Sequence, residues 1–538
     1  MKEKNKTRSD SYVNEYVQYF LHGTASPGID FEHTLVKGAL SKITLDELNA
    51  YIKGIIKDAG RDILITAPDK DKASLPTEDV FMGWIKSVEK ENLTAYHEEA
   101  NSLSLLSKAP VAGKIIKTQH DKKLNIITIT LSNGIKVLLN PTDFRNDEIL
   151  FTGVSAGGTS LYSDAEYRSA DAANMIPSFG AGNYNNAQLS KYLSGKQLSV
   201  RPSIGERQQV INGGSTVSDL EPALQLMYAH LTQPRKDTAL FKGVIARSKA
   251  ALVNRMNDPT SVFNDTVNAV LSNHNIRRAS QTVATLNKIN LDRAFNIYKE
   301  RFADASGFTF VFTGSIDTTA IKPLLEKYIA SLPAKNRKEE AKDLHINIPE
   351  GQISKTVYKG TEAKANVILV FSGLFDYSFA NNVKMDALKE NIQLRLIERL
   401  REQEGGVYSP SIRASTSKIP QGRFSLTVSF GCAPQNVEKL IASTLDEVKK
   451  VRTNGPEQVN LDKFKAETQR SIELQLKSNS FWQNYIVSQV QNKEPLNVIN
   501  EYSQYVDRVT AADVKEMANK YLNGKNFIRM VLLPEKSK

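Results

Sequence analysis

Cysteine is nearly absent from the sequence, and long apolar runs are absent altogether. The single cysteine among 538 residues is Cys432, which excludes an intrachain disulfide and cysteine-based zinc fingers. No run approaches the roughly 20 apolar residues of a membrane span, and the longest candidates, such as Val367–Phe371, have the length of a strand. The first residues are basic, but no apolar segment follows them, so they do not read as a signal peptide. We expect no membrane span, a cytoplasmic location if the chain is complete, and the periplasm or cell envelope if it is part of an exported protein.

The excess of positive charge is moderate and scattered. Lysine plus arginine (70) exceed aspartate plus glutamate (59), which gives a net charge of +11. The basic residues stand among acids, as between Asp513 and Lys525, and no arginine-rich arm or aromatic-basic stripe is present. This pattern is typical of a solvated surface, and we expect no nucleic-acid partner.

A sequence pattern that predicts a helix followed by a strand occurs three times. A chain of 538 residues is too long for one hydrophobic core, and a prior of about 150 residues per domain predicts three or four units. Thr44, Asn290 and Thr510 are each suited to cap a helix, because their side-chain oxygens can accept from a free amide of the first turn. Each helix is followed, 18 to 20 residues after the residue that precedes its cap, by an expected strand at 63–66, 308–312 or 527–531. The repeat predicts three equivalent domain endings.

Two of these endings have a complete domain in front of them. The first of the two begins with a hairpin, 126–131 and 135–139, around Asn133-Gly134; Asn-Gly favours this turn because both residues must take positive φ. In both domains strands and helices then follow without strict alternation, which predicts an α+β fold of antiparallel sheet packed on helices. We expect further strands at 149–154, 210–217, 355–358, 366–372, 411–416 and 423–430, and helices at 165–175, 220–231, 239–256, 318–329, 385–401, 435–451 and 457–477.

The first ending has only about forty residues before it, which is too few for a sheet. Its opening, Tyr12–Leu21, resembles Phe481–Val487, which precedes the last ending. We therefore expect the chain to begin inside a domain whose front is missing or supplied by another chain. The predicted division is 1–95 as the rear of a truncated domain, 96–123 as a linker, 124–333 as an α+β domain, 334–353 as a charged linker and 354–538 as a second α+β domain.

Repeated α+β domains joined by a charged linker resemble the pitrilysin and insulinase family, the inverted zincins, over essentially the whole chain. The resemblance implies four such domains in two halves that close like a clam shell, with a zinc-binding H-x-x-E-H motif on one helix of the first domain. On the equivalent helix here, Ala170 and Asn174 stand at the two His positions and Ala173 at the Glu position, and Val244–Ser248, where the third ligand would stand, has no acid. Alanine offers no lone pair and asparagine is a poor zinc ligand. We expect no metal and no cofactor in this chain, and zinc in the missing or partner half.

The histidines offer no other zinc motif. They stand at positions 22, 33, 97, 120, 230, 274 and 345, and none has another histidine four residues away, the spacing that puts two ligands on one helix face. The stretch His97-Glu98-Glu99 begins like a metallopeptidase motif but continues with Ala100 and Asn101. We interpret it as an exposed linker helix.

The last domain keeps a different part of the family pattern. Arg401, at the expected end of a helix, and Tyr408, seven residues on at the expected start of a strand, stand where the family's non-catalytic half has an Arg and a Tyr. The resemblance implies that both contact the substrate backbone next to the scissile carbonyl and support the developing oxyanion. Gly405 and Gly406 would let the chain leave the helix. The alternative is structural: an arginine at the negative end of a helix, and a tyrosine half-buried in the sheet.

Two hypotheses for function follow from the resemblance. In the first, the chain is the substrate-binding, zinc-free half of an insulinase-like metallopeptidase that hydrolyses peptides or small proteins. It pairs with a zinc-bearing N-terminal half or subunit, contributes Arg401 and Tyr408 to substrate and transition-state binding, and is inactive alone. In the second, the chain is a catalytically inactive scaffold or assembly subunit of the same family.

Overall fold

The computed structural model describes residues 1–538 except 56–59, 61, 68, 93–103 and 536–538. The chain forms two compact units, Met1–Ser102 and Leu103–Lys538. The second unit contains the sheets and carries the candidate site. Within the described ranges, no helix combines the length and the apolar character needed to cross a lipid bilayer.

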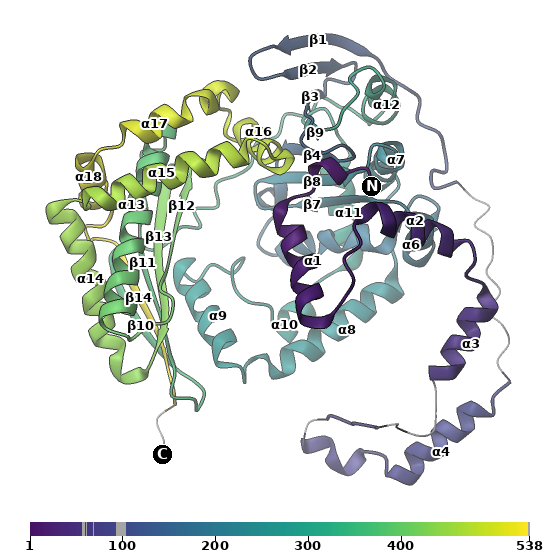
Figure 1. The fold of residues 1–538 in the computed structure, drawn as a ribbon, viewed down its shortest axis with the longest axis horizontal. Coiled ribbons are helices and arrows are strands. Elements are labelled where there is room, and N and C mark those ends of the chain that lie inside the picture. The colour runs from purple at the N-terminus through teal and green to yellow at the C-terminus, as the bar shows by residue number, and fades with distance from the viewer. Residues whose placement is uncertain (56–59, 61, 68, 93–103, 536–538) are drawn as a thin grey trace. The chain divides into compact units, whose positions relative to one another are not determined.

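The first sheet of the second unit has seven strands in the order β1-β2-β3-β9-β4-β8-β7 (Figure 1). Only the β3–β9 pair is parallel, and the other neighbours are antiparallel. The predicted Asn133-Gly134 hairpin joins β2 to β3, but only Gly134 takes the expected positive φ, at +85°, and Asn133 does not. The strands are β1 (Ile115–Asp121), β2 (Ile126–Leu131), β3 (Lys136–Pro141), β4 (Ile149–Ala156), β7 (Leu198–Ile204), β8 (Gln208–Ser215) and β9 (Thr309–Gly314).

The second sheet repeats this arrangement with five strands in the order β10-β14-β11-β13-β12. Its one parallel pair, β10–β14, corresponds to β3–β9, so the two sheets match strand for strand apart from the added β1–β2 hairpin. The strands are β10 (Gln352–Tyr358), β11 (Ala365–Leu374), β12 (Ser411–Ser417), β13 (Arg423–Cys432) and β14 (Phe527–Leu533). The predicted α+β class of antiparallel-dominated sheets on helices is confirmed.

Helices cover one face of each sheet and build its main core. The first core contains α5 (Tyr167–Ala172), the 3₁₀ segment η4 (Ala173–Phe179), α7 (Leu220–Thr232), α11 (Leu291–Phe302), and α12 (Ile321–Leu324) with its π-helical continuation η5 (Leu325–Ile329). The second contains α13 (Phe379–Leu396) with the π-helical turn η6 (Ile397–Gln403), α14 (Val437–Asn454), α15 (Gln458–Gln475), α17 (Tyr502–Arg508) and α18 (Ala511–Tyr521). The smaller elements include β5 (Gly180–Ala181), β6 (Tyr184–Asn185), α6 (Asn186–Leu193), α8 (Thr238–Arg255) and α10 (Val283–Leu286).

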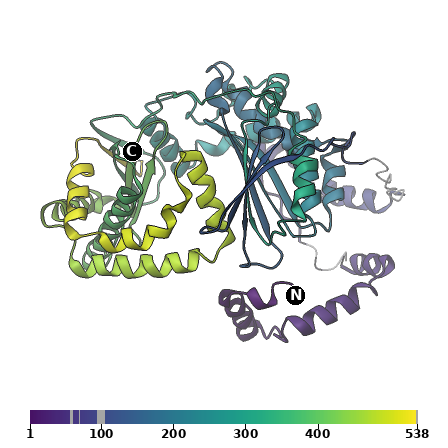
Figure 2. The ribbon, with the colours of Figure 1, turned by 90° about the horizontal axis from the view of Figure 1, so that it is seen from above.

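The two domains exchange one helix each. Helix α9 (Pro259–Leu271) lies before β9 in the chain but packs Phe263 and Val267 against Val370 and Met530 of the second sheet. In return, α16 (Asn479–Asn492) packs against the first sheet, where its buried residues meet β2, β3 and β9. Figures 1 and 2 both show α16 beside the strands of the first sheet, and Figure 1 shows α9 beside those of the second. Each sheet therefore has its second face covered by the other domain.

The sequence missed two strands of the first sheet. Residues 115–121, within the expected linker 96–123, form β1, because the exposed strand pairs with β2 along its whole length. Residues 198–204 form the edge strand β7, although Pro202 interrupts the run. An edge strand tolerates proline, since one side of its backbone has no neighbour to bond.

The charged segment 334–350 has no regular secondary structure, but its start is anchored. The carboxylate of Asp304 accepts hydrogen bonds from the amides of Lys335 at 2.9 Å and Arg337 at 2.7 Å. Burial alone would raise the pKa of Asp304, but hydrogen bonds from Ser306 and these amides lower it to about 2. A charged Asp304 therefore fixes where the chain leaves the first of the two domains.

The first unit consists of helices without a core. Helices α1 (Ser9–His22), α2 (Ile29–Leu40), α3 (Leu45–Ile55) and α4 (Glu78–Glu89) contain no buried residue. The predicted caps form, since Thr44 and Glu47 bond each other's backbone amide as Thr510 and Asp513 do. The expected strand Ile63–Thr66 is wrong: the segment has irregular backbone. A β-prone run pairs only when a neighbouring strand is present, and the described part of this unit contains none.

Candidate functional site

Arg401 lies at a helix end that is fixed by two glycines. The π-helical turn η6 continues α13 and carries Arg401 in its last turn. Gly405 has a φ of +60°, a left-handed conformation that costs glycine little. The amides of Gly405 and Gly406 donate to the carbonyls of Arg401 at 3.2 Å and Leu400 at 3.1 Å, which satisfies the helix end. The chain therefore leaves the helix after Gln403, two residues beyond the end that the sequence predicts.

Tyr408 lies close to Arg401 at the surface. The guanidinium carbon of Arg401 is 5.9 Å from the centroid of the Tyr408 ring, within the range of a cation–π contact. Tyr408 is 88% exposed and the Arg401 side chain 52%. The tyrosine stands in the loop three residues before Ser411, where β12 begins, and not in the strand itself. Its ring faces solvent because Val407, only 5% exposed, takes the inward position.

Hydrogen bonds from a neighbouring helix hold the loop after Tyr408. The side chain of Gln393 on α13 donates to the carbonyl of Pro410 at 2.9 Å and accepts from the amide of Ile412 at 2.8 Å. Both backbone groups belong to the stretch in which the loop becomes β12. Gln393 therefore sets the position of Tyr408 relative to the helix that carries Arg401.

A buried carboxylate braces the other side of the turn. Glu404 follows Arg401 by three residues, accepts from the hydroxyl of Ser443 at 2.6 Å and pairs with Arg399 at 2.8 Å. Burial would raise the pKa of Glu404, but the hydrogen bond from Ser443 and the cations Lys439 and Arg399 hold it below its usual value. The charge of Glu404 is directed inward, and Arg401 remains the basic group of this turn that is exposed beside Tyr408.

A groove adjoins this pair on the sheet. Its cavity of about 310 Å³ lies between α9 and the strands β11 and β13, and its lining includes Ser409 of the loop that follows Tyr408 and Ser411, the first residue of β12. The neighbouring strand β12 is the edge of its sheet. An edge strand presents unpaired backbone donors and acceptors, which is the arrangement by which extended peptides bind. The arginine, the tyrosine and an open strand edge are thus found in one region.

Two of the three positions of the degenerate zinc motif are packed into the first core, and the third, Asn174, is exposed. Ala170 and Ala173 are fully buried at 0% exposure. The side chain of Asn174 donates to the carbonyl of Ile204 at 3.1 Å and accepts from the amide of the same residue at 2.7 Å. Ile204 ends the edge strand β7, so the asparagine occupies backbone groups that would otherwise face outward. These three residues do not fit a zinc ion, because two have no donor atom and the third is already used.

The rest of the described chain offers no other metal site. Residues 1–92 and 104–535, with their gaps at 56–59, 61 and 68, contain no group of three or more His, Cys, Asp or Glu side chains that could hold a metal ion. His230 is buried in α7, and burial lowers its pKa to about 4, so it is neutral. The stretch His97-Glu98-Glu99 lies outside the described residues.

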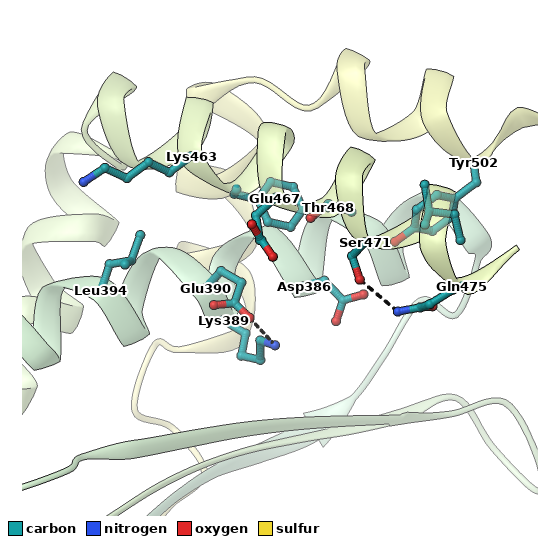
Figure 3. Close-up of a pocket in the computed structure, with 12 residues that line it drawn as sticks. Asp386, Lys389, Glu390, Leu394, Lys463, Glu467, Thr468, Ser471, Gln475 and Tyr502 are labelled. Atoms are coloured by element: carbon teal, nitrogen blue, oxygen red, sulfur yellow. Dashed lines mark hydrogen bonds and ion pairs between the residues drawn. The ribbon is translucent and has the colours of Figure 1, made fainter. Parts of the chain in front are cut away.

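A second recess lies on the helical side of the last domain (Figure 3). Its cavity of about 400 Å³ is formed mainly by α13 and α15, with charged groups of both signs around it, among them Asp386, Lys389, Glu390 and Glu467. Lys389 pairs with Glu390 at 2.6 Å. Asp386 is open to solvent through the recess, yet protein surrounds it closely enough to raise its pKa to about 6.

Sequence reasoning identified Arg401 and Tyr408 but not their supports. Gln393 and Glu404 carry no local signal, because their hydrogen-bond partners Pro410, Ile412 and Ser443 lie 17 to 39 residues away in the chain. The recess around Asp386 was missed for the same reason, since α13 and α15 meet only in the folded chain.

The chain is similar to known zinc proteases. Residues 288–468 match the family model described as the peptidase M16 inactive domain. The zinc protease PQQL-like protein of Arabidopsis thaliana is 25% identical over 512 residues, which are 91% of this chain and 50% of the relative. The chain thus spans about half the length of the curated relatives it matches.

Solved structures show the same fold. The periplasmic protease PqqL from Escherichia coli matches 99% of this chain and 59% of its own with a TM-score of 0.72 at 18% identity. The first half of that protease matches 78% of this chain and 94% of its own, with a TM-score of 0.63 at 14% identity. The chain therefore shares the fold of a large part of that protease, and most of the chain also shares the fold of the protease's first half.

These findings confirm the predicted resemblance: the chain is similar to zinc proteases over most of its length, and residues 288–468 match the peptidase M16 inactive domain.

Proposed function

We propose that this chain is the substrate-binding, zinc-free half of a two-halved M16 peptidase. In the closed enzyme, Arg401 and Tyr408 donate hydrogen bonds to the peptide backbone beside the scissile carbonyl. Both groups stabilise the negative charge that develops on the carbonyl oxygen when the bond is attacked. The reaction hydrolyses peptides or small proteins, and the chain has no activity alone.

The observation that carries this proposal is the exposed Arg401–Tyr408 pair. An arginine that served only the helix end would not need a tyrosine beside it, and a tyrosine that is 88% exposed contributes little to the core. The chain is held on both sides of Tyr408, by Glu404 before it and by Gln393 after it. Two exposed donors on a held stretch of backbone, next to an open strand edge, are suited to an extended peptide that carries charge in the transition state.

The proposal requires a partner that carries zinc. Ala170, Ala173 and Asn174 cannot provide the ligands, so we assign the metal to the other half, the N-terminal part of the same protein or a separate subunit. The two-halved build of the similar proteases supports this assignment, since this chain covers about half of them.

The test is peptide hydrolysis by the purified chain, by the zinc-bearing half and by their mixture. We expect turnover only in the mixture, and a loss on the order of a hundredfold in kcat for Arg401→Ala, the usual cost of one transition-state donor. Arg470→Ala is the matched control, because it removes an exposed arginine from α15 of the same domain. Turnover by the chain alone, abolished by a chelator, would contradict the proposal.

A second candidate is an inactive scaffold of the same family. It is supported by the complete burial of Ala170 and Ala173 and by the hydrogen bonds of Asn174 to the backbone of Ile204, which are structural roles for this helix. A scaffold tolerates Arg401→Ala, so equal turnover of the mutant and wild-type mixtures would favour this candidate.

A further inference from the structure

Helix α1 has two counterparts elsewhere in the chain. Its stretch 11–17 reads Ser-Tyr-Val-Asn-Glu-Tyr-Val, 261–267 on α9 reads Ser-Val-Phe-Asn-Asp-Thr-Val, and 480–486 on α16 reads Ser-Phe-Trp-Gln-Asn-Tyr-Ile. All three have serine first, two apolar or aromatic residues, an amide, an acid or asparagine, and a β-branched aliphatic residue at the seventh position. Each stretch precedes one of the three repeated endings by a similar length, 29 to 33 residues from its serine to the cap at Asn290, Thr510 or Thr44.

The counterparts α9 and α16 are the two exchanged helices. On α9 the apolar positions of the pattern are buried against the second sheet: Phe263 is 2% exposed, Val267 7% and Val270 7%. On α16 the seventh position, Ile486, is 0% exposed against the first sheet, and Gln483 donates to the carbonyl of Val311 in β9 at 3.1 Å. The pattern therefore marks a helix that covers the sheet of another domain.

On α1 the same face is uncovered. Val13, Val17 and Phe20 stand at the positions of Phe263, Val267 and Val270, and they are 58%, 44% and 86% exposed. Leu21, at the position of Leu271, is 61% exposed. The same apolar face packs on a sheet in α9 and α16 but is exposed in α1. This difference indicates that α1 packs on a further sheet of the same type.

We propose that α1 is the exchanged helix of a third α+β domain, and that the Val13–Val17–Phe20 face docks on the sheet of a further α+β domain in the zinc-bearing half. The inference rests on the proposed function for the existence of that half and specifies which surface joins it to this chain. The fold of the first half of PqqL, which matches that of this chain, supplies sheets of the required kind.

A second copy of this chain does not provide a free sheet face on which α1 could dock. The equivalent face of the first sheet is covered by α16, and that of the second by α9. Both sheet faces are therefore already covered within Leu103–Lys538, and the described part of the first unit has no sheet. The occupant is therefore a sheet from outside these residues.

The experiment measures binding of the full 538-residue chain to the zinc-bearing half of its source organism by sedimentation and titration calorimetry. The variant Val17→Asp places a carboxylate in the middle of the face. Because this position is exposed in the chain alone, the variant keeps the melting temperature and helix content of the wild type. We expect its affinity for the other half to fall on the order of a hundredfold, since a charge would be buried without a partner.

Tyr19→Asp is the matched control. Tyr19 is also exposed on α1, but it corresponds to Ser488, which remains exposed on α16. We expect its affinity to stay within about threefold of the wild type, as for a solvent-exposed position. Equal losses in both variants, or no loss in Val17→Asp, would overturn the assignment of the face. Self-association of the chain that Val17→Asp abolishes would also overturn it, in favour of a second copy.

Arg401→Ala separates this inference from the proposed function. If the docking surface is right and the function wrong, Val17→Asp loses binding while Arg401→Ala keeps both binding and turnover. If the function is right and the surface wrong, Arg401→Ala loses turnover while Val17→Asp binds like the wild type.

Discussion

The two domains of Leu103–Lys538 share a sheet order but use the helix that follows β4 or β11 in different ways. In the first domain this segment is short, α5 followed by η4, and it buries Ala170 and Ala173 completely. In the second, α13 continues through a π-helical turn to Arg401, which reaches solvent beside Tyr408. Equivalent places in one fold thus serve packing in one domain and an exposed donor pair in the other, so chemistry has to be assigned residue by residue.

The largest expected effect on stability comes from placing an acid at the family's glutamate position. Ala173→Glu buries a carboxylate without a partner, and we expect it to lower the free energy of unfolding by more than about 3 kcal/mol. Ser190→Glu on the exposed side of α6 is the control and should change it by less than about 0.5 kcal/mol. Denaturant unfolding measures both. A small effect of Ala173→Glu would mean that this helix can expose a side chain at position 173, as η6 exposes Arg401.

A smaller loss is expected for Asn174→Ala. The variant leaves the amide and carbonyl of Ile204 without their side-chain partner, at a cost of about 1–3 kcal/mol. Asn174→Asp keeps the acceptor but not the donor, so its stability should fall between that of Asn174→Ala and that of the wild type. Hydrogen exchange at the Ile204 amide locates the effect. Unchanged protection there in Asn174→Ala would contradict the role assigned to this side chain.

Gly405→Ala tests the turn that presents Arg401. No neighbouring atom meets an added Cβ, but the φ of +60° costs a non-glycine residue about 1 kcal/mol. Gly205→Ala is the control, because its backbone is not left-handed and its Cβ would meet ordinary contacts. We expect a drop in melting temperature for Gly405→Ala alone, together with a fall in turnover of the mixed halves. Equal melting temperatures would show that the turn is not fixed by Gly405.

The smallest effect is the pH dependence of stability that Asp386 contributes, which is compared with that of Asp304. Asp386 has its pKa raised from 3.8 to about 6 because it is surrounded by protein, so the folded chain holds that proton more tightly. Its stabilising contribution is present below about pH 4 and is lost as the pH rises through about 6. Asp386→Asn should therefore be more stable than the wild type above pH 6, by less than about 1 kcal/mol because the group is open to solvent.

Asp304 supplies the opposite sign for comparison. Its pKa is lowered to about 2, so its contribution is present above about pH 4 and is lost as the pH falls through about 2. Asp304→Asn should be less stable than the wild type at neutral pH and equal to it near pH 2. Melting temperatures between pH 2 and pH 8 measure both variants. A shift of the same sign in both would contradict the environments described for these carboxylates.

Local patterns predicted much of the fold. Asn133-Gly134 fixed the hairpin because the turn depends on two residues, and Thr44, Asn290 and Thr510 marked caps because a cap depends on one. The strand expected at Ile63–Thr66 failed because β propensity without a neighbouring strand does not form a sheet. Edge strand β7 was missed because Pro202 broke an already short pattern.

The site was predicted less completely than the fold. The Arg401–Tyr408 spacing could be found in the sequence because seven residues span one helix end and one loop. The groove, the support from Gln393 and the exchange of α9 and α16 depend on segments far apart in the chain. No local rule carries such contacts, since the pairing is decided by which apolar faces the complete fold leaves open.

The exchange of α9 and α16 makes the connecting segment 334–350 more than a spacer. In a pair of separate chains, this trade of helices would be a domain swap, and its stability would depend on protein concentration. With both domains on one chain, the swap is intramolecular, and its strength depends on the effective concentration that the segment imposes. Cleavage within the segment would therefore turn a concentration-independent unfolding transition into one that shifts with dilution.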